Sequence, residues 1–418
     1  MRSERTALIG PAAGAALLVV LIVSGGSVVG AETIVIKPHA HQLANAQSVA
    51  FSPDGRLVAA GFGGPSNGRF PLKPHGGRVA VWEADTGKFV QTIGEYGDII
   101  SLQFTSDSKA WLHSRVFTPG DSMDDNTCHL VSVADGKVAP QPGWNRNSHI
   151  AMASPIRPQI VIGQVSDIGH VFNVTDDGLL QDTLQRLKVA GSHSERRFAF
   201  STDGSVFVSA YCVFEQIADD VGTAATGHTI RLKGLTVFDA ESWSVRKSII
   251  VKSDELHDCT ALAVSRGGRW ISTGHSNGIA RIWDGKTLNL IRTLNLRTAA
   301  AVLPRFSPDG KTLAVLTQPA NSPTWIYANT PSGFEFGRKQ VGTTCDLVLF
   351  DTSDFAERRR FRFEDGTFRT YHANRPPESL NPARLAFSPD GKRLLAGCNG
   401  VVLIDAKTGN VVRHFGSR

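Results

Sequence analysis

The sequence predicts an all-β protein in which seven repeated modules, each a four-stranded antiparallel sheet, form a ring. A turn motif recurs seven times, and an apolar strand pattern follows each copy. Glycine contributes 41 of 418 residues without a three-residue period, which favours many turns and excludes a collagen-like chain. Because 41% of the residues are hydrophobic and 20% charged, the composition also excludes a chain disordered throughout.

The first 31 residues have the organisation of a secretory signal peptide. Arg2 and Arg5 precede an apolar stretch over residues 7–23, and small residues end at Ala31. The alternative is an uncleaved membrane anchor, but the apolar stretch only just reaches the lower limit of about 17 residues for a span, which favours cleavage. In both cases we expect an exported protein, and membrane contact, through residues 7–23, only if the signal is not cleaved. Residues 32–46 are then a linker or a strand that helps to close the ring.

A short turn motif marks the start of each module. Phe51-Ser52-Pro53-Asp54-Gly55 recurs almost unchanged within residues 305–311 and 386–392. Weaker copies occur at residues 104–108, 153–155, 200–204 and 264–268. Proline presets φ, aspartate bonds to the backbone ahead of it, and glycine accepts a positive φ. Each copy therefore predicts a strand, a tight turn and a second strand.

A second signature ends the third strand of each module with a large apolar residue, which an acid usually follows. These closing residues are Trp82, Val133, Val174, Phe238, Trp283, Phe350 and Ile404. A polar turn such as residues 85–88 then leads into a further strand. Each module thus has four strands, and together they occupy residues 47–418.

These modules resemble WD40 repeats, the blades of a seven-bladed β-propeller. The resemblance is clearest over residues 261–294. It implies a hydrogen-bond network inside that blade, and it says little about activity. The residues that match this network are His257, Thr273 and Trp283, with Asn277 where aspartate is usual, and Trp82 is the matching tryptophan of the first module.

Closure of the ring leaves two possibilities open. In the WD40 family the last blade often borrows an outer strand from the opposite terminus. Residues 33–37 are apolar enough to supply that strand, but residues 411–415 compete for the same position.

Four insertions between second and third strands lengthen the modules, at residues 62–78, 116–127, 213–233 and 318–344. The WD40 topology implies that all four emerge on one side, and long loops on a rigid scaffold often carry function. We expect this side to bind a protein or peptide. The candidate binding residues are Arg69, Lys73, Asp121, Asp124, Asp125, Asp219, Asp220, Trp325, Tyr327 and Arg338. Alternatively, the aromatic fourth insertion folds down and caps the central channel.

Two other functions compete with a non-catalytic scaffold: a hydrolase- or lactonase-like propeller enzyme with a site at the central channel, and a carbohydrate-binding propeller. The sequence has no haem, zinc-helix or phosphate-loop motif, and Gly64-Pro65-Ser66-Asn67-Gly68 matches a nucleophile elbow only in its letters, because it joins two strands. We therefore expect no catalytic residue, metal or cofactor. We also expect the protein to be a monomer.

Nucleic-acid binding is not expected, although the net charge is +6. The densest basic run contains Arg358, Arg359, Arg360 and Arg362. From Arg360 onward, arginine alternates with Phe361 and Phe363. This alternation is typical of a strand with one wet face, and arginine on an outer strand discourages aggregation through its edge.

The five cysteines allow two bridges in an oxidising compartment. The WD40 topology implies that Cys212 is near Cys259 and that Cys345 is near Cys398, with Cys128 left over. The alternative is that all five are buried thiols, since cysteine is among the most buried residue types.

Overall fold

The protein is described by a computed structural model. It covers residues 33–36, 46, 48–62, 77–96, 98–108, 110–115, 126–133, 135–137, 151–163, 168–176, 179–188, 193–216, 229–251, 259–275, 277–296, 302–317, 324–330, 333–339, 345–363, 384–397 and 400–415. The predicted signal peptide and most of the linker lie outside these residues.

The sheets follow one another along the chain, each with its strands in sequence order. The first contains β2 (Ser48–Phe51), β3 (Leu57–Phe62), β4 (Gly77–Glu83) and β5 (Phe89–Tyr96). The next has β6 (Asp98–Phe104), β7 (Ala110–Arg115) and β8 (Asn126–Val131). The third has β9 (Ala151–Ala153), β10 (Gln159–Ile162), β11 (Gly169–Val174) and β12 (Leu180–Leu187). The fourth has β13 (His193–Phe200), β14 (Val206–Gln216), β15 (Thr229–Asp239) and β16 (Val245–Val251).

The second half of the chain continues the pattern. A sheet is formed by β17 (Cys259–Val264), β18 (Trp270–His275), β19 (Ile279–Asp284) and β20 (Leu290–Asn295). It is followed by β21 (Val302–Phe306), β22 (Thr312–Thr317), β25 (Cys345–Asp351) and β26 (Glu357–Phe363). The last sheet has β27 (Leu385–Phe387), β28 (Arg393–Ala396), β29 (Val401–Asp405) and β30 (Val411–Phe415). Between β22 and β25, the strands β23 (Thr324–Thr330) and β24 (Gly333–Lys339) form a separate hairpin.

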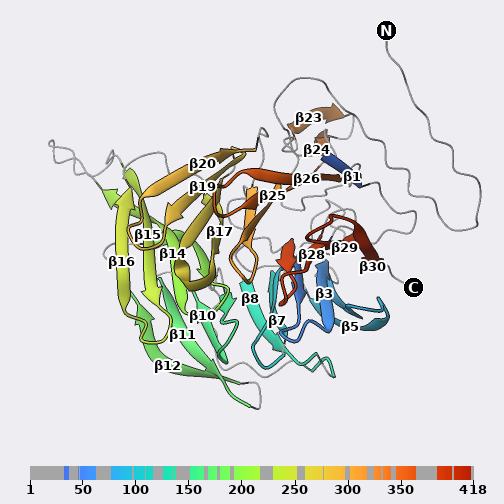
Figure 1. Cartoon of the computed structure of the whole chain (residues 1–418), viewed down its shortest axis with the longest axis horizontal. Coiled ribbons are helices and arrows are strands. Elements are labelled where there is room, and N and C mark those ends of the chain that lie inside the picture. The colour runs from blue at the N-terminus through green and yellow to red at the C-terminus, as the bar shows by residue number, and fades with distance from the viewer. Residues whose placement is uncertain are drawn as a thin grey trace, which may run out of the picture.

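The sheets form a β-propeller around a central channel (Figure 1). The first strand of each sheet lies innermost and contacts the first strand of the next, and β27 returns to contact β2. Each hydrophobic cluster combines side chains of at least two sheets, as in the cluster of Trp82, Leu403 and Phe415. Packing between sheets, rather than within one, therefore builds the core.

The expectation of seven four-stranded blades is wrong. Six sheets have at least four strands, whereas the sheet of β6, β7 and β8 has three among the described residues. The sequence after β8 contains Pro140 and Pro142, which lack the amide donors that a strand ladder uses. Residues 138–150 lie outside the described residues.

The two segments expected to compete for one outer position do not compete. The C-terminal strand β30 is the outer strand of the last sheet, paired with β29. The N-terminal strand β1 (Thr33–Ile36) instead pairs in parallel with β26 and adds a fifth strand to the neighbouring sheet. The arginine-rich strand β26 is therefore not an edge, which corrects the expectation of a charged outer strand.

Side chains join the first sheet to the last. The rings of Trp82 and Phe415 lie 5.5 Å apart between centroids. Arg393 forms an ion pair of 2.6 Å with Asp85, and Arg413 donates to the Asp85 carbonyl at 2.8 Å. Since both sheets come from consecutive segments, these contacts close the ring without a strand shared between the two termini.

The Pro-Asp-Gly turns link neighbouring modules as well as the strands they connect. In the first module the Ser52 hydroxyl donates to Asp54 at 2.5 Å and accepts from the Leu57 amide at 2.9 Å. Gly55 has a φ of +72°, which an L side chain rarely adopts. A Cβ added to Gly55 would lie 3.4 Å from Cδ of Pro389 in the last module. The turns therefore pack against one another around one end of the channel.

Within the described residues there is no helix with the length and hydropathy needed to cross a bilayer.

Candidate functional site

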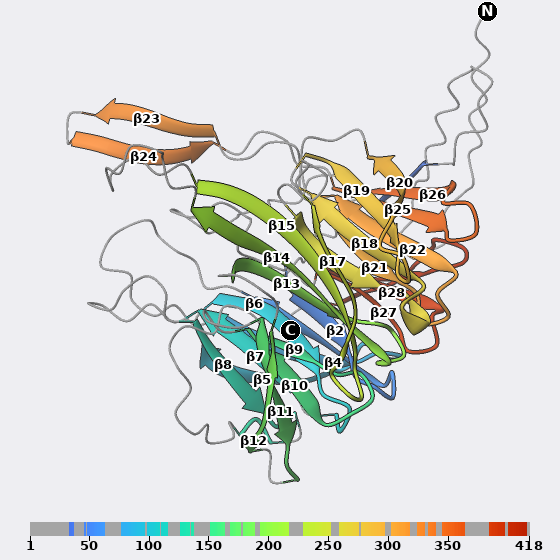
Figure 2. The same cartoon turned by 90° about the vertical axis from the view of Figure 1, so that its left-hand side faces the viewer.

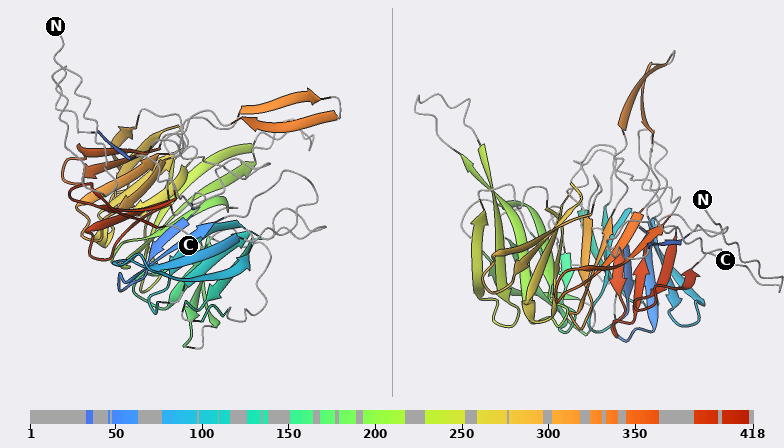
Figure 3. Two further views of the ribbon diagram at one scale, coloured as in Figure 1. Left: turned by 90° about the vertical axis from the view of Figure 1, so that its right-hand side faces the viewer. Right: turned by 45° about the horizontal axis from the view of Figure 1, so that its top comes forward.

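The two ends of the channel differ because of the strand order. Each innermost strand runs into a Pro-Asp-Gly-type turn, whereas the second strand runs the opposite way and ends where the insertions begin. Turns and insertions are therefore at opposite ends of the channel. Figure 3 shows that the extended β14–β15 pair and the β23–β24 hairpin project from the same side of the ring.

The hairpin within the fourth insertion carries three of the predicted binding residues. It stands clear of the ring in Figure 2, and its strands pair only with each other among the described residues. The register places Trp325 opposite Arg338 and Tyr327 opposite Phe336. Because alternate residues of a strand share a face, these four occupy one face of the hairpin. The opposite face holds Thr324, Ile326 and Ala328 with their partners.

The base of this insertion is held firmly. Thr317, the last residue of β22, accepts a hydrogen bond of 3.0 Å from the Asp346 amide at the start of β25. The Asp346 carboxylate accepts bonds of 2.9 Å from Arg360 and from Arg362. Burial alone would raise the pKa of Asp346, but the bonds from Arg362 and Arg360 outweigh it and lower that pKa below its usual 3.8. The basic run in β26 therefore stabilises the base of the insertion, while Phe361 and Phe363 are buried.

The third insertion begins as a continuation of its blade. Residues 213–216 and 229–233, which the sequence assigns to the insertion, extend β14 and β15 as a paired ladder. The other predicted binding residues are outside the described part of the chain: Arg69, Lys73, Asp121, Asp124, Asp125, Asp219 and Asp220. Their role in binding stays a prediction.

Among the described residues, the predicted network within the fifth sheet also includes His275, which the sequence analysis did not name. Trp283 donates from Nε1 to Oγ1 of Thr273 at 3.0 Å, and that oxygen lies 2.9 Å from Nε2 of His275. The guanidinium of Arg281 also lies 3.3 Å from this nitrogen. Because a guanidinium only donates, Nε2 is the acceptor of the bond from Arg281. His257 is outside the described residues, and Asn277 is exposed.

The cysteine bridges stay predictions. Cys259 is half-buried and its sulfur lies 3.5 Å from the Ala261 carbonyl oxygen, whereas Cys345 is fully buried. Cys398 is outside the described residues, and Cys212 lies in β14 opposite Lys233. Within the described part of the chain, no three His, Cys, Asp or Glu side chains come together in a way that could hold a metal ion.

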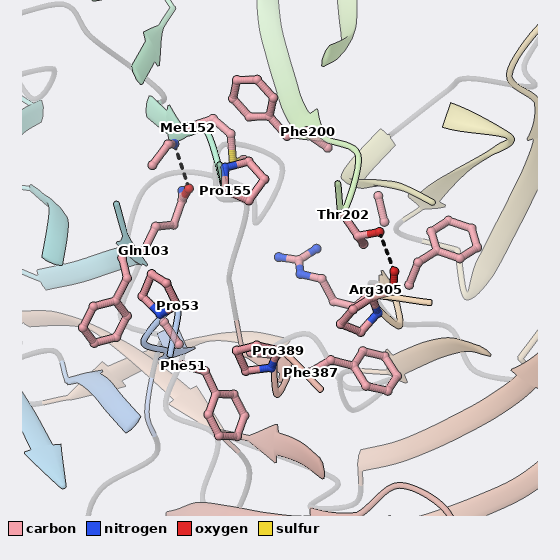
Figure 4. A pocket seen from close by; sticks show the side chains of 18 of the residues that line it. Phe51, Pro53, Gln103, Met152, Pro155, Phe200, Thr202, Arg305, Phe387 and Pro389 are labelled. Carbon is pink, nitrogen blue, oxygen red and sulfur yellow. Dashed lines mark hydrogen bonds between the residues drawn. The ribbon is translucent and has the colours of Figure 1, made fainter. Parts of the chain in front are cut away.

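A cavity of about 460 Å³ occupies the turn end of the channel. It was not foreseen from the sequence. Its walls come from the ends of the innermost strands and from the turns that follow them. Pro308 is among the lining residues, as are Pro53, Pro155 and Pro389, which Figure 4 shows. Most of the lining is apolar, and the volume lies within the range of about 300–1,000 Å³ that small-molecule sites occupy.

Arg305 is the one charged side chain among the described residues that line this cavity. It comes from β21, is half-buried, and directs its guanidinium toward the middle of the cavity (Figure 4). Its hydrogen bond within the protein goes from Nη1 to the Pro304 carbonyl at 2.8 Å. Burial lowers the pKa of Arg305 from 12.5 to about 10, so the side chain remains cationic at neutral pH.

Other polar groups of the lining are already engaged. The Gln103 amide donates to the Ala151 carbonyl at 3.2 Å and accepts from the Ala153 amide at 3.0 Å, which ties β6 to β9. The Thr202 hydroxyl donates to the Pro308 carbonyl at 3.3 Å. In contrast, the Ser101 hydroxyl is buried without a hydrogen-bond partner among the described residues.

Comparison with known proteins establishes the fold and one repeat. Residues 250–284 match the family model described as WD domain, G-beta repeat, a segment that contains Thr273 and Trp283. A crystal structure of Saccharomyces cerevisiae Sqt1, a WD40 propeller protein, is similar with a TM-score of 0.50 and 15% identity, over 90% of this chain and 87% of that chain. No curated protein matches the chain in sequence.

These findings define the class of protein as an all-β propeller. The chain contains a WD40 repeat within that propeller, and the resemblance to WD40-repeat proteins is confirmed. At 15% identity the structural likeness is evidence of fold alone, so function rests on the chain's own surface.

Proposed function

We propose that the protein is an exported, non-catalytic scaffold, a monomer that binds a protein or peptide partner through the side carrying the insertions. The WD40 propeller fold is typically a protein-interaction scaffold. Repeat proteins commonly bind partners on the face from which their insertions project.

The observation that carries this proposal is the β23–β24 hairpin. A two-stranded hairpin alone is marginally stable in water, so it gains from a surface that packs against it. This hairpin projects from the ring and has Trp325, Tyr327, Phe336 and Arg338 on one face. Aromatic residues and arginine dominate binding energy at protein interfaces.

The rigid base supports the same interpretation. Asp346, Arg360 and Arg362 fix the start of β25, and the side chains of Asp346 and Arg360 are 14% and 16% exposed. The base of the hairpin is therefore already ordered before a partner binds to the hairpin. Such preorganisation lowers the entropic cost of binding.

Two faces of one hairpin supply the test and its control. The double variant Trp325→Ser with Tyr327→Ser alters the aromatic face, and Ile326→Ser with Ala328→Ser alters the other face. The tagged full-length protein is purified from the envelope of its native cells, and co-purified proteins are quantified by mass spectrometry. We expect the first variant to lose the partner at least tenfold and the second to retain it. Equal partner recovery with both variants would contradict the proposal.

Export has its own measurement. Cell fractionation followed by N-terminal sequencing of the purified protein is expected to give an envelope or extracellular protein that begins at Glu32. A cytoplasmic protein that retains residues 1–31 would reject export, whereas an envelope protein that retains them would indicate an anchor.

A further inference from the structure

We infer that the cavity at the turn end of the channel binds a small organic acid, a single carboxylate on an apolar body, which Arg305 holds through its guanidinium. This site is separate from the proposed partner surface, because turns and insertions lie at opposite ends of the channel.

The cavity results from the residues at one repeated position. Arg305 precedes the turn serine, Ser307, by two residues. The equivalent residues of the other modules are Ala50, Gln103, Met152, Ala199, Ala263 and Ala386, and all of them line the cavity. Four of these residues are alanines, so their small side chains leave the space into which Arg305 reaches.

No acidic side chain is among the described residues that line the cavity around Arg305. No carboxylate of the described residues forms an ion pair with it, and its bond to the Pro304 carbonyl leaves most of its five N–H donors available. Ion pairs elsewhere in the ring show that this chain does pair partly buried arginines, as Arg360 pairs with Asp346 and Glu357. A cation in apolar surroundings without a counter-charge costs stability, which points to an anion from outside.

The lining selects the kind of anion. The planar guanidinium matches a carboxylate, with which it forms two parallel hydrogen bonds. One cation balances a monoanion, whereas no second basic side chain among the lining residues is present to balance a phosphate dianion. The remaining walls include Phe51, Phe200 and Phe387, which suit an aliphatic or aromatic body. The buried Ser101 hydroxyl adds one further polar group without a partner among the described residues.

Calorimetric titration of the purified protein tests this inference with probes that separate the two parts of the ligand. Octanoate and phenylbutyrate carry both parts, octanol and phenylbutanol lack the charge, and acetate lacks the apolar body. We expect at least one of the two acids to bind. The alcohol that matches this acid, and acetate, are each expected to bind at least tenfold more weakly. Inorganic phosphate is expected to bind more weakly than the acid.

Variants assign the binding to Arg305. Arg305→Met is expected to lower the affinity for the acid at least tenfold. Arg305→Lys keeps the charge but loses the planar guanidinium, and it is expected to lower the affinity less. Arg56→Gln is the matched control, since Arg56 lies in a turn at the same end but is 85% exposed. It is expected to leave the affinity unchanged.

Thermal unfolding supplies a readout that a purely structural arginine would not give. Arg305→Met is expected to raise the midpoint of the empty protein, because it removes an uncompensated charge, and to lose the rise that the acid produces in the wild type. The inference is overturned if neither acid binds at millimolar concentration. It is also overturned if Arg305→Met binds the acid as tightly as the wild type, or if phosphate binds more tightly than either acid.

Discussion

Two adjacent hydroxyls in β18 allow a direct test of what stabilises the fifth sheet. Thr273 and Ser272 are both fully buried. The Thr273 hydroxyl bonds with Trp283 at 3.0 Å and with His275 at 2.9 Å, whereas the Ser272 hydroxyl is without a hydrogen-bond partner among the described residues. The two positions differ in hydrogen bonding but not in burial.

Thr273→Val keeps the shape of the side chain and removes its oxygen. The change deletes two hydrogen bonds, each worth about 1 kcal/mol net, and strands the indole N–H of Trp283 away from water. We expect the free energy of unfolding to fall by about 2–3 kcal/mol. Ser272→Ala removes a hydroxyl that makes no bond, so we expect a change within about 0.5 kcal/mol.

Equilibrium unfolding in guanidinium chloride measures the free energy of unfolding of the wild type and both variants. If the slope of this free energy against denaturant concentration is the same for all three, differences in midpoint convert directly to differences in stability. Circular dichroism verifies that each variant has the wild-type fold. If the two variants lose the same free energy, the bonded network contributes nothing specific and the reasoning is refuted.

Two further predictions concern ring closure and acid. Phe415→Ala removes a 3%-exposed ring at the junction of the first and last sheets, and we expect it to lower the free energy of unfolding by about 3–5 kcal/mol. A chain that begins at Lys37, without β1, is expected to lose about 1 kcal/mol or less, because Ile34 is only half-buried. Denaturant unfolding measures both, and a larger loss without β1 than with Phe415→Ala would show that β1 closes the ring. The pKa of Asp346 is lower in the folded protein than the usual 3.8, so its stabilisation is complete above that value and is lost as the pH falls through the folded-state pKa. The wild type is therefore expected to lose more stability than Asp346→Asn below about pH 4, and parallel acid curves for the two proteins would contradict this.

Local signals in the sequence predicted the features that depend on nearby residues. The Pro-Asp-Gly turns form as expected because their chemistry is contained in a few residues, as the bond from Ser52 to Asp54 shows. The alternation in β26 likewise predicted buried Phe361 and Phe363. Pairing between distant segments was not predictable in this way. The parallel partner of β26 is β1, more than 300 residues earlier in the chain, and no local pattern selects it.

The same limit explains the network and the cavity. His275, two residues from Thr273 on the same strand, contacts the Thr273 hydroxyl, and the family pattern did not single it out; the role of His257 stays a prediction. A signal for the cavity was present in the sequence. Aligning the modules on the turn serine places one arginine, Arg305, at a position that is alanine in four other modules. Its meaning depends on the innermost strands meeting around one axis, which only the ring of sheets supplies.

Contact between the aromatic face of the β23–β24 hairpin and a partner can be measured directly. A photo-crosslinking amino acid is placed in native cells at position 327 on that face, at position 328 on the other face, and at position 56 at the turn end. The account predicts one discrete crosslinked protein from position 327 and none from the other two. A product from position 56 with none from position 327 would contradict it.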